Sequence, residues 1–290
     1  MASLVFFHAH PDDEAIATGG TMALAAAEGH HVVLVVATRG EQGEPVPGVL
    51  APGEALWERR VAETHASAEV LGVSEVVFLG YEDSGMMGEP SNANPACFWQ
   101  ADPDEAADRL AAVLDRVGAD VLTCYDPHGG YGHPDHIQVH RVGHLAAERA
   151  GLGSQGSPRL FESTMNRTRI TELMAAAGEL FEAEGADGAA HEATGAEEVA
   201  TGAAGEPDFG SPEEVITHAV DVTAVLDRKR AAMAAHASQV AADSFFLTLP
   251  DEAFAAAFGT EWFILPGATR APDAPFVTGL LPGNDAVSGA

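Results

Sequence analysis

Positive charge is the scarcest feature of this 290-residue chain. Lys and Arg together number 14 against 44 Asp and Glu residues, which gives a formal net charge of −30, and Lys229 is the single lysine. A surface this acidic repels phosphate backbones and anionic lipid headgroups. The composition therefore argues against nucleic-acid or membrane partners and leaves room only for a local basic pocket.

Cysteine and long apolar runs are scarce as well. The two cysteines, Cys97 and Cys124, are too few for a disulfide framework, so we expect two reduced thiols in the core. No apolar run approaches the roughly 18 residues that a membrane-spanning helix needs. The first seven residues lack a basic segment and lead directly into a polar stretch, unlike a secretory signal. These absences predict a cytoplasmic protein.

Apolar residues, in contrast, make up 46% of the chain, enough for a large core. Up to about residue 165, short runs rich in Val, Leu and Phe alternate with longer stretches of helical period. The short runs predict five strands, at 4–8, 31–38, 75–80, 120–125 and 159–165. The longer stretches predict four helices, at 16–28, 53–71, 103–117 and 134–150. This alternation is typical of an α/β fold, here a Rossmann-like, mostly parallel sheet with helices on both faces.

The composition changes in the second half of the chain, where residues 182–208 hold no Lys or Arg and are rich in Ala, Gly and Glu. We therefore divide the chain into four parts: a Rossmann-like catalytic core at 1–165, a connecting helix at 166–177, an acidic, flexible insertion at 178–214, and a smaller C-terminal α+β portion at 215–290 that completes the same domain. Within the last part we expect a strand at 215–222, a helix at 223–240, a short helix from 250 and a final strand at 261–265. The tail beyond 266 is expected to wrap the surface.

Polar side chains are densest in the four loops that follow the first four predicted strands. Ligands bind outside the carboxyl ends of the strands in open α/β sheets, so these loops should meet at one edge. They cover residues 8–14, 38–44, 81–86 and 125–136. The concentration of His and Asp there predicts a functional site at this edge of the sheet.

Two His-Pro-Asp segments follow the first and fourth strands, and each is typical of a strand-to-helix corner, because proline is tolerated at the first helical position. In the first corner His10 and Asp13 are three residues apart, and in the second His133 and His136 have the same spacing. Two imidazoles and a carboxylate from these corners would leave an ion one open position. Such a set suits catalytic Zn²⁺ and also accepts Fe²⁺, whereas structural zinc takes four protein ligands, mostly cysteines.

The corners also carry more polar groups than a metal requires. If Asp13 is a ligand, the adjacent Asp12 can serve as general base toward water that the ion activates. His133, if it is not a ligand, can give a proton to the leaving group or stabilise an oxyanion, with Asp135 fixing its tautomer. Tyr131 can add a hydroxyl toward the developing negative charge. These parts predict metal-assisted hydrolysis of an amide or ester.

The sequences His-Pro-Asp-Asp-Glu at 10–14 and Gly-Gly-Tyr-Gly-His-Pro-Asp-His at 129–136 together resemble the PIG-L (LmbE-like) de-N-acetylases. This family removes acetyl groups from N-acetylglucosamine-containing molecules, and its bacterial members include the mycothiol-pathway deacetylase and the mycothiol conjugate amidase. The resemblance covers roughly residues 3–150 and resumes weakly over 229–263, where His-Ala-Ser-Gln at 236–239 is similar to a family element.

The resemblance implies a role for each matching side chain. The metal ligands would be His10, Asp13 and His136. The catalytic groups would be Asp12 as base, His133 as electrostatic or acid partner, and Tyr131 near the oxyanion. Asp83 is similar to the family acid that holds sugar hydroxyls, and Arg60 to a substrate-side arginine. Ala17 stands where a conjugate amidase would carry a lysine, and the acidic insertion is not a general family feature.

Simpler explanations exist for several of these residues. Helix capping would explain the histidines and aspartates of the two corners, although a single site explains both motifs at once. Arg60 could pair with Glu63 on its own helix. His140 and His144 have ligand spacing after His136, yet we interpret them as surface histidines. His128 and His236 are weak candidates for groups that support a ligand.

Our functional hypothesis is a cytoplasmic, zinc-dependent hydrolase that removes an N-acetyl group from a small GlcNAc-containing molecule, as a single chain or a homo-oligomer. An alternative with the same chemistry is an amidase that cleaves mycothiol S-conjugates. An alternative of another class is a non-catalytic α/β module that binds a sugar or a metal. Intact Asp12 and His133 argue against the last, because a binding module has no use for a base beside a metal.

Overall fold

The computed structural model describes residues 1–152, 159–183 and 209–281. Most of the predicted acidic insertion and the end of the chain lie outside the described residues. Seven strands form one sheet in the order β3-β2-β1-β4-β5-β7-β6. Their bounds are β1 Ser3–His8, β2 His31–Val36, β3 Glu75–Phe78, β4 Val121–Tyr125, β5 Arg159–Thr164, β6 His218–Asp221 and β7 Thr260–Ile264.

The first five strands run parallel to one another, with β1 between β2 and β4. Four of them are almost wholly buried and nearly continuous in Val, Leu and Phe, which is why they could be placed from the sequence. Each strand begins within one residue of its predicted position and ends up to two residues earlier, where the polar loop starts. The prediction of an α/β fold is confirmed.

The C-terminal strands extend this sheet. β7 pairs antiparallel with β5 and also antiparallel with β6, so the sheet is mixed at this edge. Beyond β7, Val277 forms an isolated bridge with His218 and thereby holds part of the tail against β6. The division of the chain into four parts remains a prediction, but β6 and β7 belong to the same sheet as the N-terminal strands.

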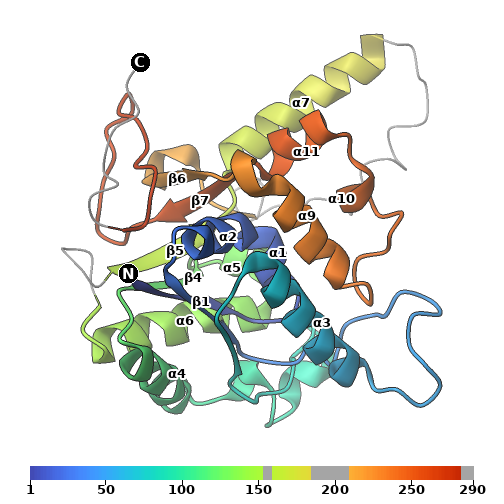
Figure 1. Ribbon diagram of the computed structural model, residues 1–290, viewed down its shortest axis with the longest axis vertical. Helices are drawn as coiled ribbons and strands as arrows, with labels where there is room; N and C mark the ends of the chain where they lie inside the picture. The colour runs from blue at the N-terminus through green and yellow to red at the C-terminus, as the bar shows by residue number, and fades with distance from the viewer. Residues whose placement is uncertain (153–158, 184–208, 282–290) are drawn as a thin grey trace.

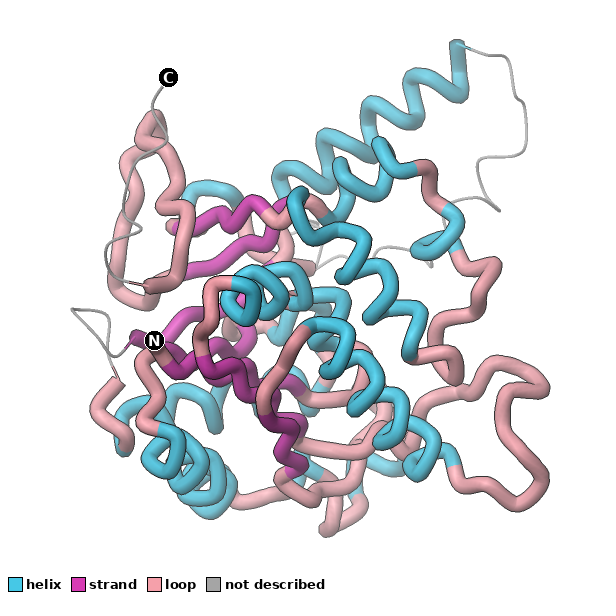
Figure 2. The backbone as a smooth tube through the Cα atoms, in the orientation of Figure 1, coloured by secondary structure: helices cyan, strands magenta, loops and turns pink. Residues whose placement is uncertain are grey.

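The helices lie on both faces of the sheet (Figure 1), and Figure 2 shows the strands enclosed between them. Their bounds are α1 Asp13–Ala17, α2 Gly19–Ala27, α3 Leu56–Leu71, α4 Pro103–Val117, α5 Gly129–Gly132, α6 Pro134–Arg149, α7 Arg167–Ala183, α9 Leu226–Ala235, α10 Phe245–Thr248 and α11 Asp251–Phe258. Short 3₁₀ turns cover Pro90–Ala93, Phe98–Gln100, Glu213–Val215 and Thr223–Val225.

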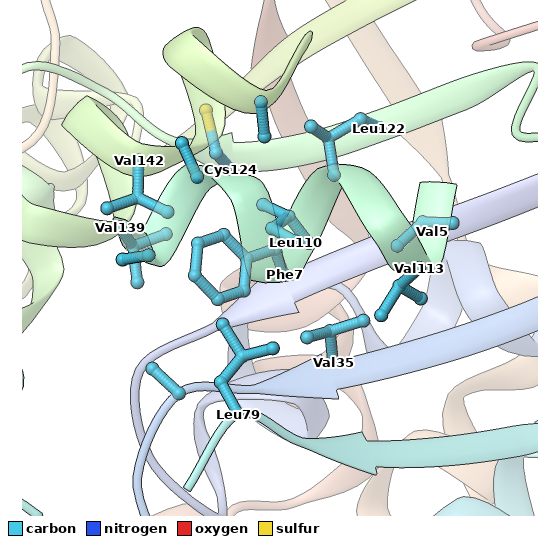
Figure 3. Close-up of a cluster of buried hydrophobic side chains, with 14 of the residues drawn as sticks. Val5, Phe7, Val35, Leu79, Leu110, Val113, Leu122, Cys124, Val139 and Val142 are labelled. Atoms are coloured by element: carbon cyan, nitrogen blue, oxygen red, sulfur yellow. The ribbon is translucent and has the colours of Figure 1, made fainter. Parts of the chain in front are cut away.

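The core has two layers because successive side chains of a strand point to opposite faces. From β1, Val5 and Phe7 enter one layer, which is completed by α4 and α6 (Figure 3). Leu4 and Phe6 enter the other layer, which α2, α9 and α11 complete. The site described below lies at the carboxyl ends of β1 to β4, where these layers meet the polar loops.

Several predicted helix boundaries are wrong. The helix expected at 16–28 is two helices, α1 and α2, separated by Thr18, whose backbone is not helical and whose hydroxyl lies 2.8 Å from Nε2 of His8. The helix expected at 223–240 ends at Ala235, where His236 leaves helical geometry. The strand expected from 215 begins at His218, after a 3₁₀ turn. Tertiary hydrogen bonds override local propensity at the first two boundaries.

Candidate active site

The loops after β1, β3 and β4 bring the predicted polar residues together. His10 lies two residues after β1, Asp83 follows β3, and His136 lies in the first turn of α6. The side chain of His10 contacts the carboxylates of Asp83 and Asp135 and approaches His136, 126 residues further along the chain. The predicted meeting of these loops at one sheet edge is therefore present in the structure.

Three donor atoms form a nearly equilateral triangle at this edge. His10 Nδ1 lies 3.5 Å from Asp13 Oδ2, His136 Nε2 lies 3.3 Å from the same oxygen, and the two nitrogens are 3.3 Å apart. Bonds of about 2.0 to 2.1 Å around a tetrahedral ion require donor separations of about 3.3 to 3.4 Å. The triangle fits a divalent cation without rearrangement.

Hydrogen bonds on the outer side of each imidazole decide which nitrogen keeps its lone pair. His10 Nε2 lies 3.2 Å from Asp135 Oδ2, and His136 Nδ1 lies 3.1 Å from the carbonyl oxygen of Gly129. With an ion bound, the outer nitrogen of each ring would keep its proton and the inner nitrogen would present its lone pair to the ion. The third donor, Asp13 Oδ2, accepts the backbone N–H of His10 at 2.8 Å.

Other sets of donors overlap with this triangle. His10, His133 and His136 also place donor atoms within 4.8 Å of one another, as do His10, Asp83, His133 and Asp135. All of them share His10. This His/Asp group can hold a metal ion, and the choice among the sets depends on the protonation of His133 and on which face of His10 is free.

The charge around His10 favours a cation. Burial alone would lower the pKa of His10, but the carboxylates of Asp83, Asp13 and Asp135 raise it well above its usual value. Conversely, burial would raise the pKa of Asp13, but His136 and His10 hold it well below its usual range. The carboxylates around His10 therefore stabilise positive charge at this point of the site.

Glycine residues allow His136 to reach its place. Gly129 has φ +66°, and a Cβ there would lie 2.6 Å from the Cβ of His136. Gly130 also has a positive φ, so the chain turns sharply before Tyr131. Only glycine combines this backbone geometry with such a close approach. The Gly-Gly-Tyr-Gly sequence thus lets the Gly129 carbonyl accept from His136.

Asp12 occupies the strained corner before α1. Its φ is +104°, and it is the only non-glycine residue with a positive φ among the described residues. Strain of this kind persists where neighbouring contacts fix the backbone, commonly at functional sites. Burial raises the pKa of Asp12 to about 6, against the opposing effect of the Arg60 guanidinium, with Asp13 adding to the rise. A carboxylate with this pKa is a base suited to neutral pH.

Arg60 is turned inward from α3 and is 3% exposed. Its guanidinium donates to Asp12 Oδ2 at 3.1 Å, to the Pro11 carbonyl oxygen, and to the Gly40 carbonyl oxygen at 2.9 Å. The alternative pairing with Glu63 is wrong, because the Glu63 carboxylate accepts from the backbone and hydroxyl of Ser238 instead.

His133 caps α6 through its side chain. Its Nδ1 accepts the backbone N–H of Asp135 at 3.1 Å. Burial lowers the pKa of His133 to about 3, and the positive charges of His10 and His136 add to the shift. The ring is therefore neutral, and its proton lies on Nε2. Asp135 fixes this tautomer through its backbone N–H, while its carboxylate lies 3.2 Å from His10 Nε2.

Tyr131 and Asp83 flank the triangle. The Tyr131 ring is 47% exposed and meets the His136 ring edge-on at a centroid separation of 4.9 Å. Desolvation of its hydroxyl and the nearby Asp13 raise its pKa, so it remains a hydrogen-bond donor. Asp83 is buried, accepts the backbone N–H groups of Gly85 and Gln42, and has Oδ1 3.4 Å from His10 Nε2.

The pairing of Glu14 with His236 was not predicted from the sequence. Glu14 is fully buried, and its Oε1 lies 2.6 Å from His236 Nε2 and accepts from the hydroxyl of Ser67. Its other oxygen accepts the backbone N–H of Asp12 at 2.9 Å. Glu14 was visible in the His-Pro-Asp-Asp-Glu motif and His236 in the His-Ala-Ser-Gln element, but their pairing joins positions 222 residues apart.

Comparison with known proteins agrees with this geometry. Residues 5–147 match the PIG-L family, described as GlcNAc-PI de-N-acetylase. A 1D-myo-inositol 2-acetamido-2-deoxy-alpha-D-glucopyranoside deacetylase from Acidothermus cellulolyticus is 43% identical over 282 residues, which cover 94% of this chain and 91% of the relative. The chain belongs to the PIG-L family. This confirms the resemblance found in the two His-Pro-Asp motifs.

Two solved structures share the fold of this PIG-L chain. N,N'-diacetylchitobiose deacetylase from Pyrococcus horikoshii has a TM-score of 0.51 at 21% identity and covers 83% of this chain and 72% of its own. The 4-carboxy-2-hydroxymuconate hydratase GalB from Pseudomonas putida KT2440 has a TM-score of 0.53 at 19% identity. The match covers 93% of this chain and 99% of GalB. Because one is a deacetylase and the other a hydratase, the fold alone does not decide the reaction.

The sequence relatives decide the class of reaction. The relative from Acidothermus cellulolyticus is named a deacetylase and matches almost the whole chain. This PIG-L chain is accordingly a deacetylase, an enzyme that hydrolyses an amide bond. In the part of the chain that the structure describes, no helix combines the length and the apolar character that a bilayer crossing requires.

Proposed function

We propose that this chain is a zinc-dependent deacetylase that releases acetate from 1D-myo-inositol 2-acetamido-2-deoxy-alpha-D-glucopyranoside. The near full-length similarity to a relative named for this substrate supports the choice. The observation that carries the hydrolytic chemistry is the triangle of His10 Nδ1, Asp13 Oδ2 and His136 Nε2, with sides of 3.3 to 3.5 Å.

The ligands we propose are His10, Asp13 and His136. The alternative set with His133 is less suitable, because Nδ1 of that ring already accepts a hydrogen bond and Nε2 carries the proton. The set with Asp83 and Asp135 would use His10 Nε2, the nitrogen that faces the Asp135 carboxylate. Two imidazoles and one carboxylate suit Zn²⁺, and Fe²⁺ satisfies the same donors. When bound, the ion would acidify water and polarise the acetamide carbonyl.

Asp12 is the proposed general base. The water proton passes to the Asp12 carboxylate as the water oxygen bonds to the acetamide carbon. When the C–N bond breaks, the same proton can pass from Asp12 to the amine, so acetate and a free amino sugar leave without net change in the enzyme. A pKa near 6 suits both halves of this transfer.

His133 and Tyr131 are the proposed oxyanion partners. The neutral His133 ring carries its proton on Nε2, so we assign it hydrogen bonding to the oxyanion rather than proton donation. The Tyr131 hydroxyl is protonated and the residue as a whole is half-exposed, which suits a group that meets the substrate as it enters. A single oxyanion donor contributes about 10²- to 10³-fold to turnover.

The substrate-binding assignments concern Asp83 and Arg60. Asp83 is proposed to accept sugar hydroxyls, because its buried carboxylate is held rigidly by two backbone N–H groups beside His10. For Arg60 the contacts favour a different role. Its guanidinium donates to three oxygens of this chain, so we infer that it positions Asp12 rather than the sugar.

The test is acetate release by the full-length protein, with zinc content measured on the same sample. The inositol-linked GlcNAc glycoside should yield one acetate per free amine, and a bulky acylated mycothiol S-conjugate should react much more slowly. Faster cleavage of the conjugate would favour the amidase alternative. Binding of the glycoside without acetate release would indicate a binding module and contradict the proposal. A cytoplasmic location and the number of subunits remain predictions.

A further inference from the structure

A second group of metal-binding side chains lies away from the active-site triangle. Cys124 near the end of β4, with His140 and His144 of α6, offers three donor atoms within 4.8 Å of one another. Glu162 of β5 lies against both rings, since its Oε1 is 2.7 Å from His144 Nε2 and 3.5 Å from His140 Nδ1. His140 Nδ1 also lies 3.0 Å from the carbonyl oxygen of Tyr125, which leaves its Nε2 as the nitrogen for an ion. The four side chains supply one sulfur, two ring nitrogens and one carboxylate oxygen.

The fold places these four side chains together by regular geometry. Cys124 and Glu162 are register partners on the parallel strands β4 and β5, so their side chains leave the same face of the sheet. His140 and His144 are four residues apart and therefore share one face of α6. Gly143 lets α6 approach closely here, because a Cβ on it would lie 2.6 Å from the Cβ of Cys124.

Burial and charge distinguish this cluster from a surface histidine pair. Cys124 is buried, and the Glu162 side chain is only 8% exposed. In the described ranges, the ion-pair partners of Glu162 are the two imidazoles, and no Lys or Arg ion pair with it is present. A nearly buried carboxylate beside a thiol is costly unless positive charge accompanies it. Figure 3 shows Cys124 beside Val139 and Val142 of α6, at the margin of the apolar layer.

We propose that Cys124, His140, His144 and Glu162 form a second site, which takes a divalent transition metal of the zinc type. Tetrahedral bonds of about 2.3 Å to sulfur and 2.0 to 2.1 Å to nitrogen or oxygen require donor separations of about 3.3 to 3.6 Å. The donors of Cys124, His140 and His144 lie within 4.8 Å of one another and Glu162 Oε1 lies against both rings, so the side chains have to adjust to these separations as the ion binds. The thiol proton is released to solvent as the ion binds.

This site would be structural rather than catalytic, because four protein donors leave the ion no open position. It would tie α6 to β4 and β5 one helical turn after His136, without sharing a ligand with the active site. Ions can enter from the surface: His144 is partly exposed and lines a cavity of about 330 Å³ together with Leu145, Glu148 and Pro266.

Cobalt titration of the metal-free, full-length protein tests the proposal. The active-site triangle contains no sulfur, so a near-ultraviolet thiolate-to-cobalt charge-transfer band reports only the second site. We expect the wild-type chain to bind two equivalents and to show the band. Cys124→Ser should lose the band and keep one equivalent, whereas Cys97→Ser, at the other buried cysteine, should behave as wild type. His136→Ala should lose the active-site equivalent and keep the band.

The outcomes separate this site from the proposed catalytic function. If the wild-type chain binds only one equivalent of cobalt and still shows the charge-transfer band, the second site is supported and the catalytic metal site is contradicted. The absence of the band from wild type, its persistence in Cys124→Ser or its loss in Cys97→Ser would overturn the second site. If Cys124→Ser does not fold, His144→Ala serves instead. Loss of a residue that merely orients a ligand costs about 10- to 100-fold in affinity, so loss of a ligand should cost at least about 100-fold. Unchanged affinity would contradict the proposal.

Discussion

The Asp135 carboxylate lies 3.2 Å from His10 Nε2, on the side of the ring that faces away from the metal-binding triangle. The same residue uses its backbone N–H to bond Nδ1 of His133 at 3.1 Å. One buried aspartate thereby sets the tautomers of two imidazoles: one presents a lone pair and the other a proton. The active site depends on this difference between chemically identical rings.

Substitution of Asp135 tests this dependence. In Asp135→Ala the His10 ring loses the nearer of the two carboxylates that face Nε2 and keeps only Asp83 at 3.4 Å, so zinc affinity should fall by about 10- to 100-fold. Asp135→Asn is the matched control, because its amide oxygen can still accept from His10 while its amide nitrogen takes the place of Oδ1, which has no partner. Its affinity should stay closer to wild type. Equal affinities for the two variants, measured by competition with a chelator, would show that Asp135 does not orient His10.

Removal of the proposed base should separate turnover from metal binding. Asp12→Asn is expected to lower kcat by about 10²- to 10⁴-fold, because it cannot accept the water proton. Zinc content should stay unchanged, since Asp12 is not one of the proposed ligands. Elemental analysis and acetate release on one preparation provide the two measurements. Near-normal turnover would remove Asp12 from the role of base.

The pH dependence of kcat/KM tests the role of Asp12 without substitution of that residue. A general base works only when deprotonated, so kcat/KM should fall tenfold per pH unit below its pKa. Burial raises that pKa to about 6, and a nearby cation would lower it, so the acid limb should lie at or below about pH 6. Because Arg60 also lowers this pKa, Arg60→Gln should move the limb to higher pH. A limb that stays in place or moves to lower pH would rule out their coupling.

Alanine substitutions at two glycines distinguish the effect of backbone strain from loss of the metal site. Gly129 and Gly118 have φ of +66° and +61°, so alanine at either position should cost about 1 to 2 kcal/mol of stability. Only at Gly129 would the new Cβ strike His136, 2.6 Å from its Cβ, whereas nothing lies within 4 Å at Gly118. Gly129→Ala should therefore lose zinc and activity, and Gly118→Ala should keep both. Zinc retained by Gly129→Ala would contradict the assigned packing.

The single lysine is expected to matter for stability rather than catalysis. Lys229 is 1% exposed, and its Nζ lies 2.6 Å from Glu261 Oε1, while Glu261 also accepts the backbone N–H groups of Gly20 and Thr21. Lys229→Met leaves that carboxylate buried without its cation and should cost about 3 to 5 kcal/mol in urea unfolding. The double variant Lys229→Met with Glu261→Gln should recover part of the loss. A single variant as stable as wild type would show that the pair is dispensable.

Much of the fold and the meeting of the site loops could be predicted from the sequence, for physical reasons. Strands covered on both faces are nearly continuous in apolar residues, so β1, β2, β4 and β5 stand out. Parallel strands bring their carboxyl ends to one edge, and this places His10 and His136 together despite their separation in the chain. The antiparallel pairing of β7 with β5 has no such local signal, because it depends on packing at the sheet edge.

The partners of buried polar groups could not be predicted in the same way. Local spacing favoured a pair between Arg60 and Glu63 on α3, yet each side chain bonds a distant loop. Similarly, Asp135 is two residues from His133 but sends its carboxylate to His10. Helical spacing shows which side chains are near neighbours, whereas burial requires each polar group to find whichever donor or acceptor the tertiary fold supplies.

The most direct test of the account is anomalous diffraction at the zinc absorption edge from crystals of the zinc-loaded protein. We expect an anomalous peak about 2.0 to 2.1 Å from His10 Nδ1, Asp13 Oδ2 and His136 Nε2, with His133 outside bonding distance. A peak bonded to His133 in place of Asp13, or no peak between the two His-Pro-Asp corners, would contradict the proposed ligand set and the hydrolytic role built on it.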